Sequence, residues 1–104
     1  ALGQASQASG GSSTALGGGA IASGIASTSM GAGSVASADA SIALGAFAQT
    51  TSQAGVAIGI SAQSTHTGAV ALGANSLTDR SNSVSVGSSG VQRQITNVAA
   101  GTQG

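Results

Sequence analysis

The sequence predicts an all-β protein, a parallel β-roll in which the chain winds as a solenoid of short coils. Three observations indicate this fold class: an uninterrupted repeat of 14 residues, apolar positions spaced two apart, and a scarcity of the side chains that fill a globular core. The 104 residues include 18 Gly, one Phe, and no Trp, Tyr or Cys. Because aromatic side chains dominate most cores, burial must come from stacked coils and from contacts between chains.

A glycine preceded by a large apolar residue marks each repeat. It recurs every 14 residues, at Gly3, Gly17, Gly31, Gly45, Gly59, Gly73 and Gly87. Fourteen residues also equal two heptads, but apolar positions two apart have the period of a strand, and the Gly and β-branched content opposes a helix. One repeat therefore suits one coil of two short strands and two tight corners, stacked about 4.8 Å from the next coil.

The size of the side chains decides which of them point into the roll. Opposite walls of so narrow a coil lie too close for anything larger than Gly, Ala or Ser. The residues expected to line the interior are Gly31, Ala43, Gly45, Ala57, Gly59, Ala71 and Gly73. The alternative is that the large apolar columns fill the interior and the small columns face solvent.

With the small residues inside, the large apolar residues form a continuous stripe on one outer face. They are Leu16, Met30, Ile42, Leu44, Val56, Ile58, Val70, Leu72, Val84 and Val86. A monomer would leave this stripe in water, and large exposed apolar patches mark sites of interaction. We therefore predict that several copies of the chain associate through it.

The opposite wall, six to ten residues after each glycine, is expected to be polar and solvated. It carries Ser9, Ser23, Ser37, Thr51, Thr65 and Asp79. A ligand would have to dock on this wall.

Composition argues against catalysis, cofactors and nucleic acid. The chain has two Asp, two Arg and one His, and it lacks Lys, Glu, Tyr and Cys. A nucleophile, a base and an orienting group are therefore not available together, and there is no basic patch for phosphates. His66 is expected to be a solvated corner residue, and calcium-binding rolls need an Asp in every turn. We predict no enzyme activity, no cofactor and no metal site.

Units such as VALGANS, IALGAFA and VAIGISA resemble the SVAIG-type repeats of YadA-like heads in trimeric autotransporter adhesins. The resemblance covers residues 1 to about 90, and the tail from Thr78 to Thr102 is similar to the neck that ends such heads. It implies a left-handed parallel β-roll, a homotrimer, and display on the outer membrane of a Gram-negative bacterium. It also implies attachment to host extracellular matrix or host cells. A coiled-coil stalk and a C-terminal membrane anchor would then lie outside this sequence.

The 14-residue rhythm stops after Val86, so we divide the chain into head repeats over residues 1–87 and a neck over residues 88–104. In the neck, Val91, Ile95 and Val98 are spaced four and three apart, which is compatible with a short helix or an apolar seam at a trimer axis. We expect Ile95 and Val98 to bury against their counterparts in neighbouring chains. Asp79, Arg80 and Arg93 are expected to make polar contacts between chains, although an exposed Arg can equally be solvated.

Adhesion to a host, by many weak contacts made at once, is the function that the sequence favours. Self-association of heads on neighbouring cells is the main alternative, since it would use the same outer wall. An ice-binding solenoid is a further alternative, but it requires a regular Thr ladder. Here the threonines are scattered among columns, at Thr50, Thr51, Thr65, Thr67 and Thr78.

Overall fold

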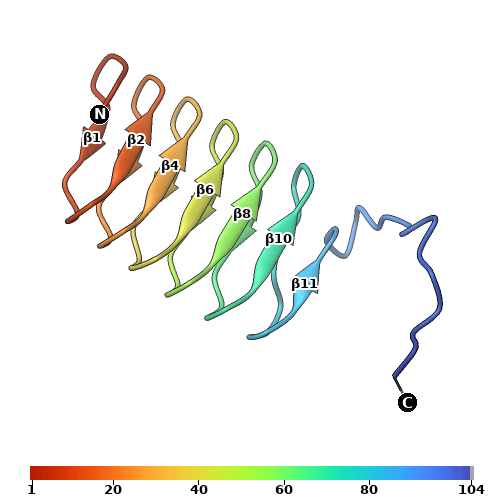
Figure 1. Cartoon of the computed structure of the whole chain (residues 1–104). Coiled ribbons are helices and arrows are strands. Elements are labelled where there is room, and N and C mark those ends of the chain that lie inside the picture. Colours follow the sequence, from red (N-terminus) through yellow and green to blue (C-terminus); the bar gives the residue numbers. More distant parts are fainter. Residues whose placement is uncertain (104) are drawn as a thin grey trace.

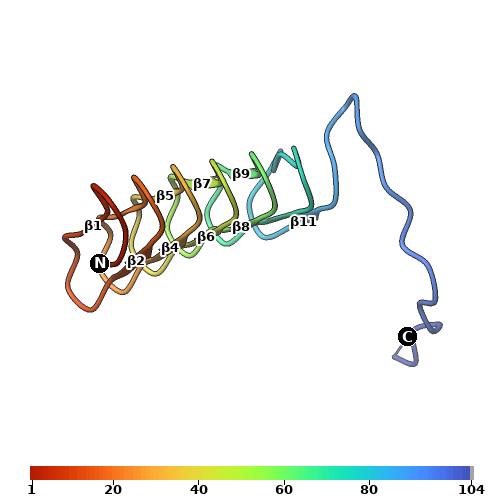
Figure 2. The same cartoon turned by 90° about the horizontal axis from the view of Figure 1, so that it is seen from above.

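The computed structural model describes residues 1–103, and their regular structure is entirely β. Two parallel sheets form the walls of a flattened tube (Figures 1 and 2). The six-stranded sheet contains β2 (Thr14–Leu16), β4 (Thr28–Met30), β6 (Ile42–Leu44), β8 (Val56–Ile58), β10 (Val70–Leu72) and β11 (Val84–Ser85). The five-stranded sheet contains β1 (Gln7–Ala8), β3 (Ile21–Ala22), β5 (Val35–Ala36), β7 (Gln49–Thr50) and β9 (Gln63–Ser64).

Each strand pairs in parallel with the strand one coil later, in the register set by the repeat. Ile42 lies opposite Val56 in one sheet, and Gln49 lies opposite Gln63 in the other, 14 residues on in both cases. The same step relates the other strand pairs, so one repeat is one coil. The predicted all-β parallel solenoid of 14-residue coils is confirmed.

The core is a narrow space between the two sheets that only small side chains occupy. Its buried apolar residues are all alanines: Ala15, Ala20, Ala22, Ala36, Ala43, Ala48, Ala57, Ala62, Ala69 and Ala71. Ser and Thr fill the equivalent places in other coils. The buried serines bond locally; Ser29 and Ser34 hydroxyls lie 2.6 Å apart, and Ser41 Oγ donates to Ala38 O at 2.6 Å. These serine hydroxyls can therefore replace methyl groups without losing hydrogen bonds.

The repeat glycines lie at corners, which corrects the prediction that they line the interior. Gly31, Gly45, Gly59 and Gly73 are only half buried. A Cβ on Gly45 would come within 2.7 Å of the Gly59 backbone, and the Gly45 φ is +129°. Glycine is therefore required because the corners of successive coils stack backbone on backbone, in a conformation that side chains disfavour.

The second strand of each coil begins earlier than the sequence suggested. β3 starts at Ile21, four residues after Gly17, whereas the predicted wall starts six residues after each glycine, at Ser23 for this coil. The reason is that the corner after the glycine is short, because its second residue adopts the left-handed conformation; Gly19 has a φ of 71°. The residues that follow this second strand form the other, wider corner of the coil.

After β11 the chain leaves the stack (Figure 1). Residues 86–103 contain no helix, and their regular pairing is a single antiparallel bridge between Ser88 and Val91. The helical form of the predicted neck seam is therefore wrong for this single chain. Ile95 and Val98 are 70% and 67% exposed, so any burial of these two side chains must come from other chains.

Candidate interface surfaces

The outer face of the six-stranded sheet carries the predicted apolar stripe. In β6 the central Ala43 is fully buried, while Ile42 and Leu44 on either side are 39% and 40% exposed. The same alternation holds in the other three-residue strands of this sheet, because successive side chains of a strand point to opposite faces. The large columns therefore lie outside and the small columns inside, and the reverse arrangement does not occur.

This apolar face runs along the six-stranded sheet and carries no charged side chain. Its members are Leu16, Met30, Ile42, Leu44, Val56, Ile58, Val70, Leu72, Val84 and Val86, and all of them remain partly exposed. Burying the part that is still exposed would contribute roughly 1 kcal/mol per side chain. The stripe therefore has the character of a surface that other molecules cover.

The outer face of the five-stranded sheet is different, because its side chains do not repeat one chemistry. One outward column reads Ile21, Val35, Gln49, Gln63 and Leu77, and the next reads Ser23, Ser37, Thr51, Thr65 and Asp79. We call these two columns the mixed face. Ser37 Oγ donates to Thr50 O at 3.2 Å, while the exposed side chains of Thr51 and Gln63 are available to a ligand. The mixed face thus combines hydrogen-bonding groups with apolar contacts, as a protein-binding surface does.

Two exposed apolar residues on the corner after the repeat glycine were not predicted from the sequence. Phe47 is 61% exposed and Ile60 is 60% exposed. The Phe47 ring lies over Gly33, since a Cβ at Gly33 would fall 2.8 Å from it, and Phe47 itself has a φ of 61°. A lone aromatic looks like a core residue in a sequence, and only the corner geometry places it outside.

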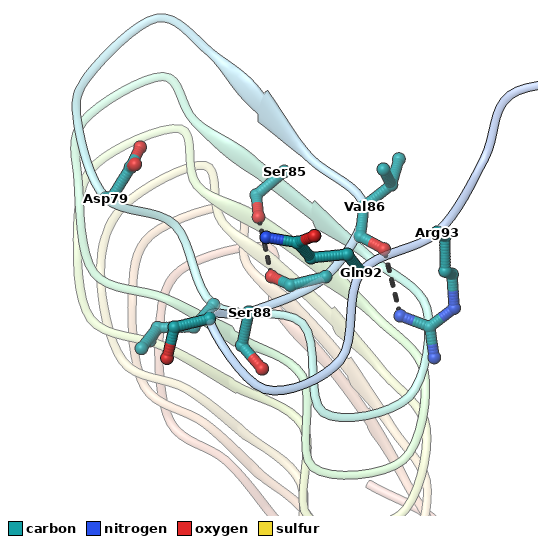
Figure 3. Close-up of a pocket in the computed structure, with 9 residues that line it drawn as sticks. Asp79, Ser85, Val86, Ser88, Gln92 and Arg93 are labelled. Atoms are coloured by element: carbon teal, nitrogen blue, oxygen red, sulfur yellow. Dashed lines mark hydrogen bonds between the residues drawn. The ribbon is translucent and has the colours of Figure 1, made fainter.

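A cavity of about 610 Å³ opens at the C-terminal end of the roll (Figure 3). It lies where the chain folds back under the last coil after β11. The lining residues are Leu77, Asp79, Ser85, Val86, Gly87, Ser88, Ser89, Gln92 and Arg93. Asp79 is the one carboxylate and Arg93 the one cation among these lining residues.

The charged residues expected in the neck do not form one cluster. Asp79 and Arg80 make an exposed ion pair at 3.5 Å, which contributes little to stability. Arg93 instead contacts acceptors of its own chain at the end of the roll. Contacts of these three residues with neighbouring chains stay a prediction.

His66 is more firmly held than expected for a solvated corner residue. It is half buried, and its Nδ1 lies 3.0 Å from Thr78 Oγ1 and 3.2 Å from Thr65 Oγ1. Within residues 1–103, no three His, Asp, Glu or Cys side chains group closely enough to hold a metal ion. No helix in that range is long and apolar enough to cross a membrane.

Comparison with known proteins shows which family this chain belongs to. The chain matches the family described as the YadA head domain repeat over residues 1–20, 22–48, 51–76 and 67–89. This chain belongs to the YadA head repeat family. A solved structure, the collagen-binding domain of the Yersinia adhesin YadA, is 33% identical, with a TM-score of 0.52. The match covers 92% of this chain and 69% of that domain. No match was found among curated proteins.

The YadA head assignment fits the geometry of each coil. The matched segments run from the first coil to the end of the stack, so the family repeat and the structural repeat coincide. The resemblance stated from the VALGANS-type units is therefore confirmed. The role that this family supports is that of an adhesin head on a bacterial surface, and not that of a known enzyme class.

Proposed function

We propose that this YadA head works as a homotrimer that attaches a Gram-negative bacterium to host extracellular matrix or host cells, by multivalent binding without catalysis. The observation that carries the proposal is a roll with an uncharged apolar face on one side and a mixed face on the other. The first face suits contacts between copies. The second stays free for a ligand.

Assembly follows from the ten side chains of the apolar face. Three copies that turn this face toward a common axis would bury it and would leave the mixed face of each copy outward. In the trimer each mixed face occurs three times, so weak contacts made by a single coil are multiplied. We propose that the trimer is displayed on the outer membrane of the bacterium.

The neighbour described as a collagen-binding domain makes collagen the first candidate ligand. A collagen triple helix has a uniform repeating surface without a protruding anchor. A face of stacked coils that repeats similar polar and apolar groups suits such a ligand better than a single deep pocket does. Fibronectin, laminin and host-cell glycans are the other candidates.

A binding assay with the assembled protein tests this proposal. Triple-helical collagen, fibronectin, laminin and host cells are immobilised, and the wild type is compared with the double variant Thr51→Glu/Thr65→Glu on the mixed face. The matched control is Gln53→Glu/Thr67→Glu, two exposed residues at the wide corner that receive the same added charge. We expect binding to at least one matrix protein or to host cells, lost in the mixed-face variant and kept in the control.

Absence of binding to all of these surfaces would contradict host adhesion. In that case, clumping of beads coated with the protein would assign the mixed face to self-association of heads. An ice-binding function is not favoured by the structure, because Thr51 and Thr65 continue into Ser37 and Asp79 rather than into further threonines.

A further inference from the structure

Two corner carbonyls of each regular coil accept amides from the coil that follows. Ile58 O accepts from Gly73 N at 2.7 Å, and Ile60 O accepts from Asn75 N at 2.9 Å. The same two bonds recur at the earlier corners, for example from Gly59 N to Leu44 O at 2.9 Å. The stack must therefore end with carbonyls whose partner coil is missing, and buried or half-buried carbonyls without partners are costly.

Arg93 occupies the place of the missing amides. Its Nη2 donates to Ala74 O at 2.8 Å, and Ala74 is the counterpart of Ile60 one coil later. Its Nη1 donates to Val86 O at 2.9 Å (Figure 3) and to Ser76 Oγ at 3.2 Å. Ser76 Oγ in turn donates to Leu72 O at 2.8 Å, so this carbonyl, the counterpart of Ile58 O, is also satisfied.

Packing around Gly73 gives a second, independent observation. A Cβ on Gly59 would meet the Gly73 backbone at 2.5 Å, because the next corner stacks on it. A Cβ on Gly73 would instead meet Arg93 Cζ and Nη1 at 3.0 Å. The guanidinium thus covers the corner at Gly73, whereas the backbone of the next coil covers each earlier corner.

The chemistry of these contacts suits arginine. All the groups that it meets can accept hydrogen bonds, and a guanidinium presents five N–H donors in a fixed planar fork and no acceptor. A lysine would bring the same charge on a single nitrogen, which cannot reach three separated acceptors in a fixed geometry.

We propose that Arg93 is the terminal cap of the roll, a side chain that replaces the backbone amides of the next coil and closes the last corner. Leu77 N, which donates to Gly87 O at 3.0 Å, completes the closure on the five-stranded side. Repeat proteins need such terminal caps, because an open end exposes unpaired edges. This role is separate from adhesion and does not depend on any ligand.

Thermal unfolding and amide hydrogen exchange of the whole chain test the cap. The variants are Arg93→Lys, Arg93→Gln and Arg93→Ala, and the control is Gln94→Ala, which shortens the exposed polar side chain next to Arg93. We expect all three Arg93 variants to melt several degrees below the wild type. Exchange at Asn75, Ser76 and Leu77 should rise at least tenfold, while exchange in β4 and β6 stays unchanged.

Two outcomes would overturn the proposal. One is an Arg93→Lys variant with wild-type exchange at Asn75 to Leu77, because charge alone would then suffice. The other is a set of Arg93 variants that match Gln94→Ala in both melting and exchange. Since Arg93→Lys and Arg93→Gln are mild changes at the end of the chain, the test stays decisive even where Arg93→Ala fails to fold.

Discussion

At the scale of single residues, the space between the two sheets sets what each interior position tolerates. Ala57 and Ala71 are fully buried, and their neighbours across the roll are also alanines or serines. Protein interiors are close-packed, so a wall of alanines leaves no room for added methylene groups. Interior positions should therefore be limited by size first and by polarity second.

Ala57→Leu should destabilise the chain much more than Gln63→Leu does. Overpacking a tight interior costs typically about 1–3 kcal/mol, whereas the Gln63 side chain is exposed. Urea unfolding of the two variants measures the difference. Equal loss of stability in both would mean that the interior and exterior columns are exchanged.

Thr50 offers the opposite test, because its buried Oγ1 has no hydrogen-bond partner in the structure. Thr50→Val removes the hydroxyl and keeps the shape, so it should raise the free energy of unfolding by roughly 1 kcal/mol or more. The control is Thr51→Val, next to it on the exposed side, which should change little. A destabilised Thr50→Val variant would show that the hydroxyl is satisfied, for example by a buried water.

At the scale of the elements, the corners are as demanding as the strands. The short corner brings successive backbones into contact at each repeat glycine, and its second residue is left-handed even where it is Phe47 or Asn75. Such residues are uncommon outside glycine and cost free energy that the rest of the coil must supply. The loss of stability caused by replacing a glycine with alanine should therefore differ strongly from one glycine to another.

Gly45→Ala should destabilise the roll by roughly 1–3 kcal/mol, since it strains the backbone and overlaps the next coil. Its new Cβ would lie 2.7 Å from Gly59 backbone atoms, at a φ of +129°. Gly11→Ala is the matched control, because a Cβ there meets nothing within 4 Å. Comparable melting of the two variants would refute backbone-on-backbone stacking at the corners.

The neck makes a separate prediction. Replacing Ile95 and Val98 with Ser should lower the melting temperature of the assembled protein more than Thr51→Ala and Thr65→Ala together do, because we expect the two apolar side chains to bury between chains. Calorimetry on both double variants measures it. If the two double variants melt at the same temperature, residues 88–104 do not stabilise the contacts between chains.

The sequence predicts the strands of this fold better than its corners. The strict period sets the register of the whole stack, and side-chain size separates Ala43 from Leu44. Size could not separate an interior glycine from a corner glycine such as Gly45, because both need a small residue for different reasons. The short corner could not be recognised for a similar reason, since its left-handed residue is Gly in two coils but Ala5, Phe47, Ser61 or Asn75 in the others.

At the scale of the whole molecule, the chain is a one-dimensional stack whose apolar face has no partner within residues 1–103. Each coil contacts its neighbours along the stack, and the six-stranded sheet keeps its large side chains outside. A core of alanines buries little apolar area, so a small domain of this kind is marginal alone. Contacts between copies should thus contribute much of its stability.

Sedimentation of the purified chain tests whether the apolar face holds three copies together. We expect a folded trimer over a wide concentration range, and a smaller or unfolded species for Leu44→Asp/Leu72→Asp, which places two charges on the apolar face. The exposed substitution pair Gln49→Asp/Gln63→Asp on the mixed face should sediment as the wild type does. A wild-type chain that sediments as a monodisperse, folded monomer would show that the apolar face does not need a partner.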